Sequence, residues 1–318
     1  MSNSVKFHPI LMHFAARYSG FTYGEFASDY RALVDSNLKC LEDFEMDAVG
    51  LISDPYRETS AFGAPVTFPA EGVPQCRNIL VNSIEDVKNL KNPDVYKEVR
   101  TMDRIRAGME LKKHVGSKVP VIGWIEGPLA ESCNLAGVNE VLLKLMMEPD
   151  FVKRLINKTM ITARDFARAQ VEAGCEIIGV GDAICSQIST ENYREFVKEK
   201  HRELFQYIKS LGAKVKLHIC GNTTHLLEDI REVKPNIMDI DWMVDMDEAR
   251  KLLGDRIIRS GNLDPVTVIQ DKGVEEIRKE TEHLCLKEAD RRFILSGGCE
   301  ITVNTPPEHL KAMRDVSK

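Results

Sequence analysis

The 318-residue sequence lacks several patterns that would assign a function directly. No GxGxxG fingerprint follows its first predicted strand and no GxxxxGK[ST] motif occurs, which disfavours a dinucleotide-binding fold and a nucleotide-hydrolysing P-loop. None of its eight cysteines forms a CxxC pair, so any metal site must combine residues from distant segments. No low-complexity segment and no long internal repeat is present.

The chain also lacks the marks of membrane, secreted and nucleic-acid-binding proteins. No apolar run reaches the roughly 18 residues that span a bilayer, and the first residues lack the apolar core and cleavage site of a secretory signal. The net charge of −6 disfavours a nucleic-acid partner, because phosphate binding requires a basic face. We therefore predict a cytoplasmic protein that binds neither membrane nor nucleic acid, with mostly reduced cysteines.

What the sequence does contain is an alternation of short apolar runs with amphipathic segments. The runs are six to eight residues long and rich in Ile and Val, as expected for parallel strands buried on both faces. They cover residues 47–54, 119–126, 175–182, 214–220, 237–242, 256–261 and 292–298. Helical spacing marks residues 136–148, 150–173, 191–211, 224–233, 274–287 and 307–314.

This alternation predicts one domain, residues 1–318, with the fold of a (β/α)8 TIM barrel. Residues 1–45 would form an N-terminal helical segment packed on the barrel, with a helix over 23–45. An open doubly wound sheet is the alternative. Only seven strands are visible, so we expect the eighth in residues 57–80, where glycines and prolines otherwise indicate a loop or a short hairpin.

Polar residues follow most of the predicted strands. In a (β/α)8 barrel the active site lies at the C-terminal ends of the strands, so these residues are the candidates for function. They are Asp54, Glu126, Asp182, His218, Cys220, Asp239, Asp241, Asn262, Asp264 and Cys299.

The stretch 214-KVKLHICGN-222 suggests a metal site. His218 and Cys220 are two residues apart on a strand and therefore project from the same face. Cys299 ends another strand after two glycines, and one nitrogen with two sulfurs suits Zn²⁺ with an open fourth position. The same spacing also occurs in packed cores, so spacing alone leaves both interpretations open. Lys216 shares the face of His218 and would need a carboxylate partner inside the barrel.

Three motifs resemble a known family: 217-LHICGNTTHLL-227, 261-GNLDP-265 and 297-GGCEITVNTPPEHL-310. Together they resemble the uroporphyrinogen decarboxylase superfamily, and the H-x-C…C pattern resembles its zinc-dependent branch, the methylcobamide:thiol methyltransferases of the coenzyme M type. The resemblance implies a (β/α)8 barrel in which His218, Cys220 and Cys299 bind zinc. It also implies a small thiol substrate and a corrinoid-binding partner protein that presents methylcobalamin.

The decarboxylases of the superfamily are a poorer match. Their N-terminal signature carries two arginines, whereas 12-MHFAARY-18 keeps Arg17 and has His13 in the first position. Asp54 does match the active-site aspartate that follows the first strand of those enzymes. Among the strand-end carboxylates, Glu126 and Asp182 could orient the thiol or a base.

Asp239 and Asp241 are candidates to complete the zinc shell or to hydrogen-bond His218 from behind. We therefore predict catalytic roles for Asp54, Glu126, Asp182 and Asp239. The alternative for each of them is a purely structural role, as a carboxylate bonded to backbone amides or to a barrel lysine. Cys185, just past a strand end, is a further possible site residue.

The predicted reaction is methyl transfer from the corrinoid to a metal-activated thiolate. Three alternatives stay open at this point: transfer of methyl from a small methylated substrate to the corrinoid, decarboxylation of a tetrapyrrole, and non-catalytic binding of a corrinoid or metal.

Overall fold

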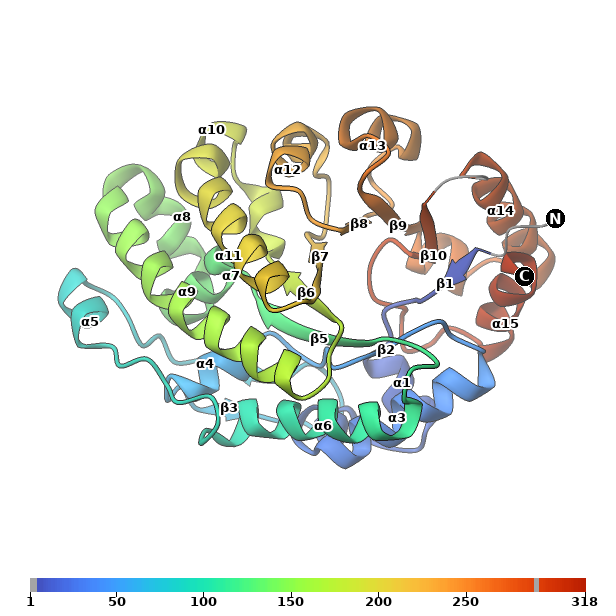
Figure 1. The fold of residues 1–318 in the computed structure, drawn as a ribbon, viewed down its shortest axis with the longest axis horizontal. Helices are drawn as coiled ribbons and strands as arrows, with labels where there is room; N and C mark the ends of the chain where they lie inside the picture. Colours follow the sequence, from blue (N-terminus) through green and yellow to red (C-terminus); the bar gives the residue numbers. More distant parts are fainter. Residues whose placement is uncertain (1–4, 289–291) are drawn as a thin grey trace.

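The computed structural model describes residues 5–288 and 292–318. Eight parallel strands form one curved sheet in the order β1-β10-β9-β8-β7-β6-β5-β2, and helices surround it (Figure 1). The strands are β1 (Lys6–Phe7), β2 (Val49–Gly50), β5 (Val121–Glu126), β6 (Ile177–Gly181), β7 (Lys214–His218), β8 (Ile237–Ile240), β9 (Ile258–Leu263) and β10 (Phe293–Gly297). This confirms the predicted α/β fold of the TIM-barrel type.

The two edge strands of the sheet, β1 and β2, are linked to each other. The Asp47 amide donates a hydrogen bond to the Phe7 carbonyl at 2.9 Å, and the Phe7 amide donates to Asp47 Oδ2 at 2.8 Å. These bonds join the segment just before β2 to β1, so the sheet curls round until its two edges are linked. The C-terminal ends of all eight strands therefore face one mouth.

The eighth strand does not lie where the sequence analysis placed it. Six of the seven predicted runs contain a strand and the run 256–261 overlaps β9, but the eighth strand is β1, which pairs with β10 through Phe7 and Leu295. The expectation of a barrel strand in residues 57–80 was wrong. That region holds α4 (Arg57–Ala61) and a separate antiparallel hairpin of β3 (Val66–Thr67) and β4 (Gln75–Cys76). Strand β1 is two residues long, begins with a lysine and is followed by His8 and Pro9, so no run rich in Ile and Val marks it.

The helices lie outside the strands (Figure 1). The α-helices not yet named are α1 (His13–Tyr18), α2 (Tyr23–Ser28), α3 (Tyr30–Asp43), α5 (Ile84–Asn89), α6 (Val99–Val115), α7 (Pro128–Ala136), α8 (Val138–Met147), α9 (Pro149–Glu172), α10 (Thr190–Asn192), α11 (Lys198–Ser210), α12 (Leu227–Val233), α13 (Met246–Leu253), α14 (Val274–Lys287) and α15 (Pro307–Ser317). Short 3₁₀ or π turns form η1 (Ala183–Gln187), η2 (Tyr193–Val197), η3 (Thr224–Leu226) and η4 (Pro265–Gln270).

Two differences from the predicted helices have clear causes. The single helix expected over 23–45 is interrupted at Asp29, whose side chain accepts from the Arg31 amide at 2.9 Å and so caps the start of α3. Helix α6 was not predicted. Its buried side includes Arg100, Thr101 and Arg104, so the sequence shows little apolar periodicity there.

The barrel interior is filled at its N-terminal end. Isoleucines from the starts of β5, β6 and β8 pack together there, with Ala48 before β2. Above them lies a cavity of only about 20 Å³, which His8, Trp124 and Lys216 help to line. A cavity of that size holds about one water molecule. Any substrate must therefore approach from the mouth of the barrel.

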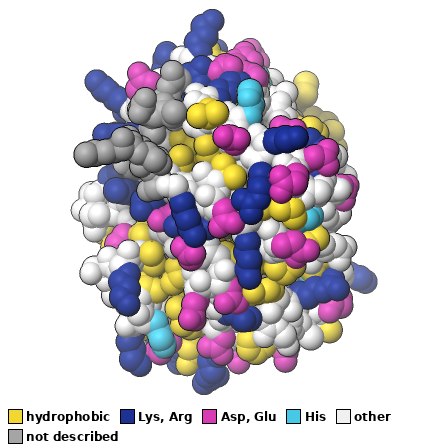
Figure 2. Space-filling model, turned by 90° about the vertical axis from the view of Figure 1, so that its right-hand side faces the viewer, with side chains coloured by type: hydrophobic (Ala, Val, Ile, Leu, Met, Phe, Trp, Pro, Cys, Tyr) yellow, Lys and Arg dark blue, Asp and Glu magenta, His cyan; other side chains and the backbone are white. Residues whose placement is uncertain are grey.

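The face that carries the C-terminal helices shows Lys and Arg side chains interspersed with Asp and Glu (Figure 2). On that face neither sign of charge forms a continuous patch. Within the described ranges, no helix has both the length and the apolar character needed to cross a membrane.

Candidate metal centre

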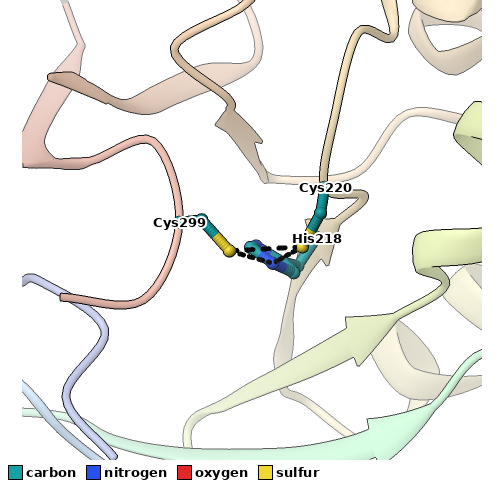
Figure 3. Close-up of side chains that lie close together, drawn as sticks. All are labelled: His218, Cys220 and Cys299. Carbon is teal, nitrogen blue, oxygen red and sulfur yellow. Dashed lines mark hydrogen bonds between the residues drawn. The ribbon is translucent and has the colours of Figure 1, made fainter. Parts of the chain in front are cut away.

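The three predicted zinc ligands converge at the barrel mouth. His218 is the last residue of β7, Cys220 follows two residues later, and Cys299 comes from the loop after β10 (Figure 3). His218 Nε2 lies 2.9 Å from Cys220 Sγ and 3.8 Å from Cys299 Sγ, and the two sulfurs are 3.3 Å apart. The fold thus brings together residues separated by 79 to 81 positions in the sequence.

Two glycines allow the ligand loops to take this course. Gly221 has φ of +90°, a left-handed conformation that turns the chain directly after Cys220. Gly298 passes so close to the end of β8 that a Cβ there would lie 2.3 Å from the Trp242 nitrogen. A side chain at position 298 would therefore push the Cys299 loop away from the other two ligands.

Asp239, at the end of β8, holds His218 from behind. Its Oδ2 lies 2.9 Å from His218 Nδ1, and its Oδ1 lies 3.0 Å from the ammonium of Lys216. The carboxylate partner expected for Lys216 is therefore Asp239. Burial by itself would raise the pKa of the Asp239 carboxyl, but Lys216 and the hydrogen bond with His218 outweigh burial and hold that pKa well below its ordinary value. An ionised Asp239 accepts a hydrogen bond from His218 Nδ1 and so orients the ring with Nε2 facing the two thiols as the potential metal ligand.

Asp241 joins the turn after Cys220 to the end of β8 through backbone amides. Its Oδ2 accepts from the Gly221 amide at 2.5 Å, and its Oδ1 accepts from the Trp242 amide at 2.7 Å. The sequence left open whether Asp239 or Asp241 would bond His218. The structure places Asp239 there and gives Asp241 contacts with the turn after Cys220.

The donor set fits Zn²⁺. One imidazole nitrogen, oriented by a carboxylate, and two thiol sulfurs are the donors that zinc prefers, and three protein ligands leave a fourth position for a substrate. Both cysteines are partly exposed, so a small molecule can reach them. Hydrogen bonds from Cys220 and His218 lower the pKa of the Cys299 thiol to about 4, despite its burial. That thiol is therefore readily available as a thiolate ligand.

Asp54 and Glu126 lie in a separate buried cluster on the β2–β5 side of the mouth. Asp54 pairs with Arg100, accepts from Ser53 Oγ at 2.7 Å and from the Tyr56 amide at 2.9 Å. Burial would raise the pKa of Asp54, but Arg100 and Arg57 outweigh burial and lower it. The aspartate predicted as a shared catalytic residue is thus bound within the protein.

Glu126, at the end of β5, lies 2.8 Å from Arg57 Nη2, while its amide donates to Glu58 Oε1 at 2.8 Å. Burial and the neighbouring Glu58 raise the pKa of Glu126 well above its ordinary value, against the opposing effect of Arg57. Glu131 of α7 is also buried and bonds Thr59 Oγ1. Sequence inspection missed Glu58 and Glu131, because acidic residues in helices leave no local signal of burial.

Asp182, after β6, belongs to another fully buried group. Its carboxylate accepts from the Ala130 amide at 2.7 Å and contacts His201 Nε2 at 2.9 Å. His201 Nδ1 in turn lies 3.0 Å from the Tyr193 hydroxyl. These contacts fasten α7 and α11 to the end of β6. No pattern in the sequence marked His201 as a partner of Asp182.

The remaining candidates lie at the rim of the mouth. Arg17 is exposed and donates to Asn304 Oδ1 at 2.9 Å, and His13 stacks on Tyr23 with ring centroids 4.7 Å apart. Asn262 and Asp264 bond backbone groups of the loops that they join. Glu300 was not predicted. It accepts from the His13 amide at 2.9 Å, and burial raises its pKa to about 7.

Comparison with known proteins agrees with the motifs. The model of the family described as uroporphyrinogen decarboxylase (URO-D) matches residues 7–318. The chain is 27% identical to a methylcobamide:CoM methyltransferase, MtaA, of Methanosarcina barkeri over 233 residues, 71% of this chain and 67% of that protein. It is 25% identical to a uroporphyrinogen decarboxylase of Geobacter metallireducens over 315 residues, 94% of this chain and 90% of that protein.

Among solved structures, a methyltransferase from Methanosarcina mazei superposes with a TM-score of 0.90 at 20% identity, covering 99% of this chain and 94% of that one. A B12-independent methionine synthase from Shewanella sp. W3-18-1 superposes with a TM-score of 0.63 at 11% identity, over 99% of this chain and 98% of that one. At these identities the two likenesses establish the fold.

Proposed function

The chain belongs to the uroporphyrinogen decarboxylase family, and within that family we propose that it is a zinc-dependent methyltransferase. It would transfer a methyl group between a corrinoid carried by a partner protein and a small thiol. The observation that carries the proposal is the convergence of His218, Cys220 and Cys299 at the barrel mouth, with Asp239 behind the histidine. The similarity to a methylcobamide:CoM methyltransferase supports the same reaction.

His218, Cys220 and Cys299 would hold the zinc ion. When bound, zinc lowers the pKa of a thiol so that the nucleophilic thiolate is present at neutral pH. The chain contributes two cysteinate charges, which together match the charge of Zn²⁺, and an imidazole whose tautomer Asp239 fixes. In the proposed transfer a sulfur–carbon bond forms as the cobalt–carbon bond breaks. The electron pair of that bond stays on cobalt, and the thiol proton passes to solvent.

The geometry of the mouth suits two reactants that arrive from outside. The interior cavity of about 20 Å³ is too small for either of them. Trp242 and Met243 follow β8 beside the ligand loops and are 47% and 50% exposed. A partner that brings methyl-cobalt to the metal centre would have to cover this apolar part of the rim.

Decarboxylation of a tetrapyrrole is less well supported. A substrate with several carboxylates requires cationic side chains that are free to bind it. Arg57 pairs with Glu126, and Arg100 pairs with Asp54. Arg17, by contrast, is exposed. The catalytic roles predicted for Asp54, Glu126 and Asp182 stay predictions, since the contacts of all three lie within the protein.

Metal analysis with a transfer assay tests the proposal. Protein purified without chelator should contain about one zinc per chain, and His218→Ala and Cys299→Ser should lose it. Cys285→Ser is the matched control, because Cys285 lies in α14 and is not one of the three convergent ligands. The wild type should demethylate methylcobalamin in the presence of a small thiol. A wild type that takes up no zinc even when zinc is added would rule out this function.

A further inference from the structure

Lys216 is a buried cation directly below the metal centre. It lies on β7 two residues before His218, and its side chain is only 2% exposed. Buried lysines are rare unless they are paired, because the ammonium loses its hydration. Lys216 Nζ lies 3.0 Å from Asp239 Oδ1. Strand alternation predicted that this lysine points into the barrel, but the proposed methyl transfer does not assign it a role.

Asp239 connects this lysine to the ligands. One carboxylate oxygen faces Lys216 and the other contacts His218 Nδ1, so the side chain bridges the two at 3.0 and 2.9 Å. A zinc ion with two cysteinates has no net charge. The carboxylate of Asp239 and the ammonium of Lys216 also cancel each other. The whole buried assembly is therefore neutral only while Lys216 is present.

The other titratable groups around this pair do not supply an equivalent charge. His8 enters from the segment after β1, and burial together with Lys216 lowers its pKa to about 3, so it is neutral at neutral pH. Asp47 lies near His8 and pairs with Lys6 and Arg314. On the mouth side are the thiols of Cys220 and Cys299 and the Asp241 carboxylate, which binds two backbone amides.

We propose that Lys216 is a positioning residue that acts through Asp239 to set the charge of the metal centre, and thereby the acidity of a thiol bound there. Without Lys216, an uncompensated negative charge lies behind His218 and makes the imidazole a stronger electron donor. A thiol at the centre then holds its proton more tightly. Without the charge of Asp239, Lys216 alone remains and the thiol loses its proton more easily. This inference rests on the proposed function.

Cobalt(II) in place of zinc makes the effect visible without an activity assay. Thiolate ligation gives cobalt(II) a charge-transfer absorption band. Cys220 and Cys299 contribute to it already, so the quantity titrated against pH is the increase in the band when 2-mercaptoethanol is added. The variants are Lys216→Met, Asp239→Asn, the double variant, and Lys216→Arg as the matched control that keeps the charge. We expect the pH midpoint to rise by about one unit in K216M and to fall by about one unit in D239N.

The double variant should return close to the wild-type midpoint, because both charges are then removed, and K216R should stay near the wild type. A merely structural role predicts instead that both single variants weaken cobalt binding and move the midpoint in the same direction. That result, or an unchanged midpoint in K216M, would overturn the inference. If K216M does not fold, the comparison between D239N and the double variant tests the inference instead, because these two proteins differ only at position 216. The midpoint of the double variant should then be the higher of the two. Equal midpoints in those two also overturn it.

The inference and the proposed function fail in different ways. A wild type that binds neither cobalt nor zinc contradicts both. A wild type that binds metal and gives the thiolate band, with variants that do not shift in opposite directions, contradicts only the role of Lys216.

Discussion

Two groups of ligand-type residues lie at the ends of neighbouring strands, β6 and β7. One is Asp182, Cys185 and His201, and the other is His218, Cys220 and Cys299. In each group the potential ligand atoms all lie within 4.8 Å of one another. By residue type and separation, both could hold a metal ion.

The two groups differ in the bonds that their atoms already make. Both ring nitrogens of His201 are occupied, one by Asp182 and the other by Tyr193, and the Asp182 carboxylate also binds the start of α7. All three residues of that group are fully buried. At the other group, His218 Nε2 and the two sulfurs contact one another and face the mouth. Unused donor atoms with access from outside, more than residue types, distinguish a metal site from a buried polar network.

We call His218, Cys220 and Cys299 the open group, and Asp182, Cys185 and His201 the closed group. The largest effect should follow from removing a ligand of the open group. Cys220→Ser should abolish stabilisation by zinc, because two protein ligands hold the ion far more weakly than three. Excess zinc should raise the unfolding free energy of the wild type by about 4 kcal/mol at 1,000 times its dissociation constant. Thermal unfolding with zinc and with chelator measures this difference. A C220S protein that zinc still stabilises fully would contradict the assigned ligand set.

The next largest effect should come from the closed group. His201→Ala leaves the buried Asp182 carboxylate without its ring partner, and loss of a hydrogen bond to a charged group costs about 1.5–3 kcal/mol. Urea unfolding should show this loss while the zinc content stays at the wild-type level. His201→Gln, which can still donate to Asp182, serves as the milder control. Loss of zinc from a folded H201A protein would mean that the closed group also supports metal binding.

The contrast between these groups shows which site residues the sequence could predict and which contacts it could not. His218 and Cys220 were predictable because strand alternation puts them on one face, and Cys299 because a barrel gathers its strand ends. Asp182 and Asp239 looked alike, since each is an aspartate at the C-terminal part of a predicted strand. What separates them comes from elsewhere in the fold: α7 and α11 surround Asp182, while Lys216 and His218 face Asp239.

The elements that escaped prediction share a physical cause, because their stability depends on neighbours more than on their own sequence. Strand β1 consists of two residues that take their hydrogen bonds from β10 and from Asp47. Helix α6 buries arginines whose charges are balanced by residues such as Asp54. Neither element has an apolar pattern that would identify it before the fold is known.

Glu131 extends the comparison to a buried acid whose donors, among the residues that the structure describes, are the neutral groups of Thr59 and Asn134. Burial, with Glu58 and Glu126 nearby, raises its pKa well above the ordinary value. The folded state therefore binds the proton more tightly than the unfolded state, and the unfolding free energy falls as pH rises above about 4.3, the ordinary glutamate pKa. Each unit by which folding raises the pKa of Glu131 lowers the unfolding free energy by about 1.4 kcal/mol, once the pH exceeds the pKa of both the unfolded and the folded state.

Glu131→Gln should remove this dependence. The variant should be more stable than the wild type at pH 8 by about 1–3 kcal/mol, and the difference should shrink toward pH 5. Urea unfolding at both pH values measures it, with the exposed Glu85→Gln as the control. A Glu131→Gln protein that is less stable than the wild type at pH 8 would indicate that the ionised carboxylate is part of a favourable ion pair.

The smallest effect is expected at Cys185, the thiol of the closed group. It is fully buried, and burial together with Asp182 raises its pKa well above the ordinary value, so it is a neutral thiol. Cys185→Ala should cost about 1 kcal/mol of stability, through lost packing, and should leave zinc content and zinc affinity unchanged. Equilibrium competition with a colorimetric chelator measures both. Two zinc ions per wild-type chain and one in C185A would show that the closed group opens to admit a metal, because the neutral thiol would then have to lose its proton to become a ligand.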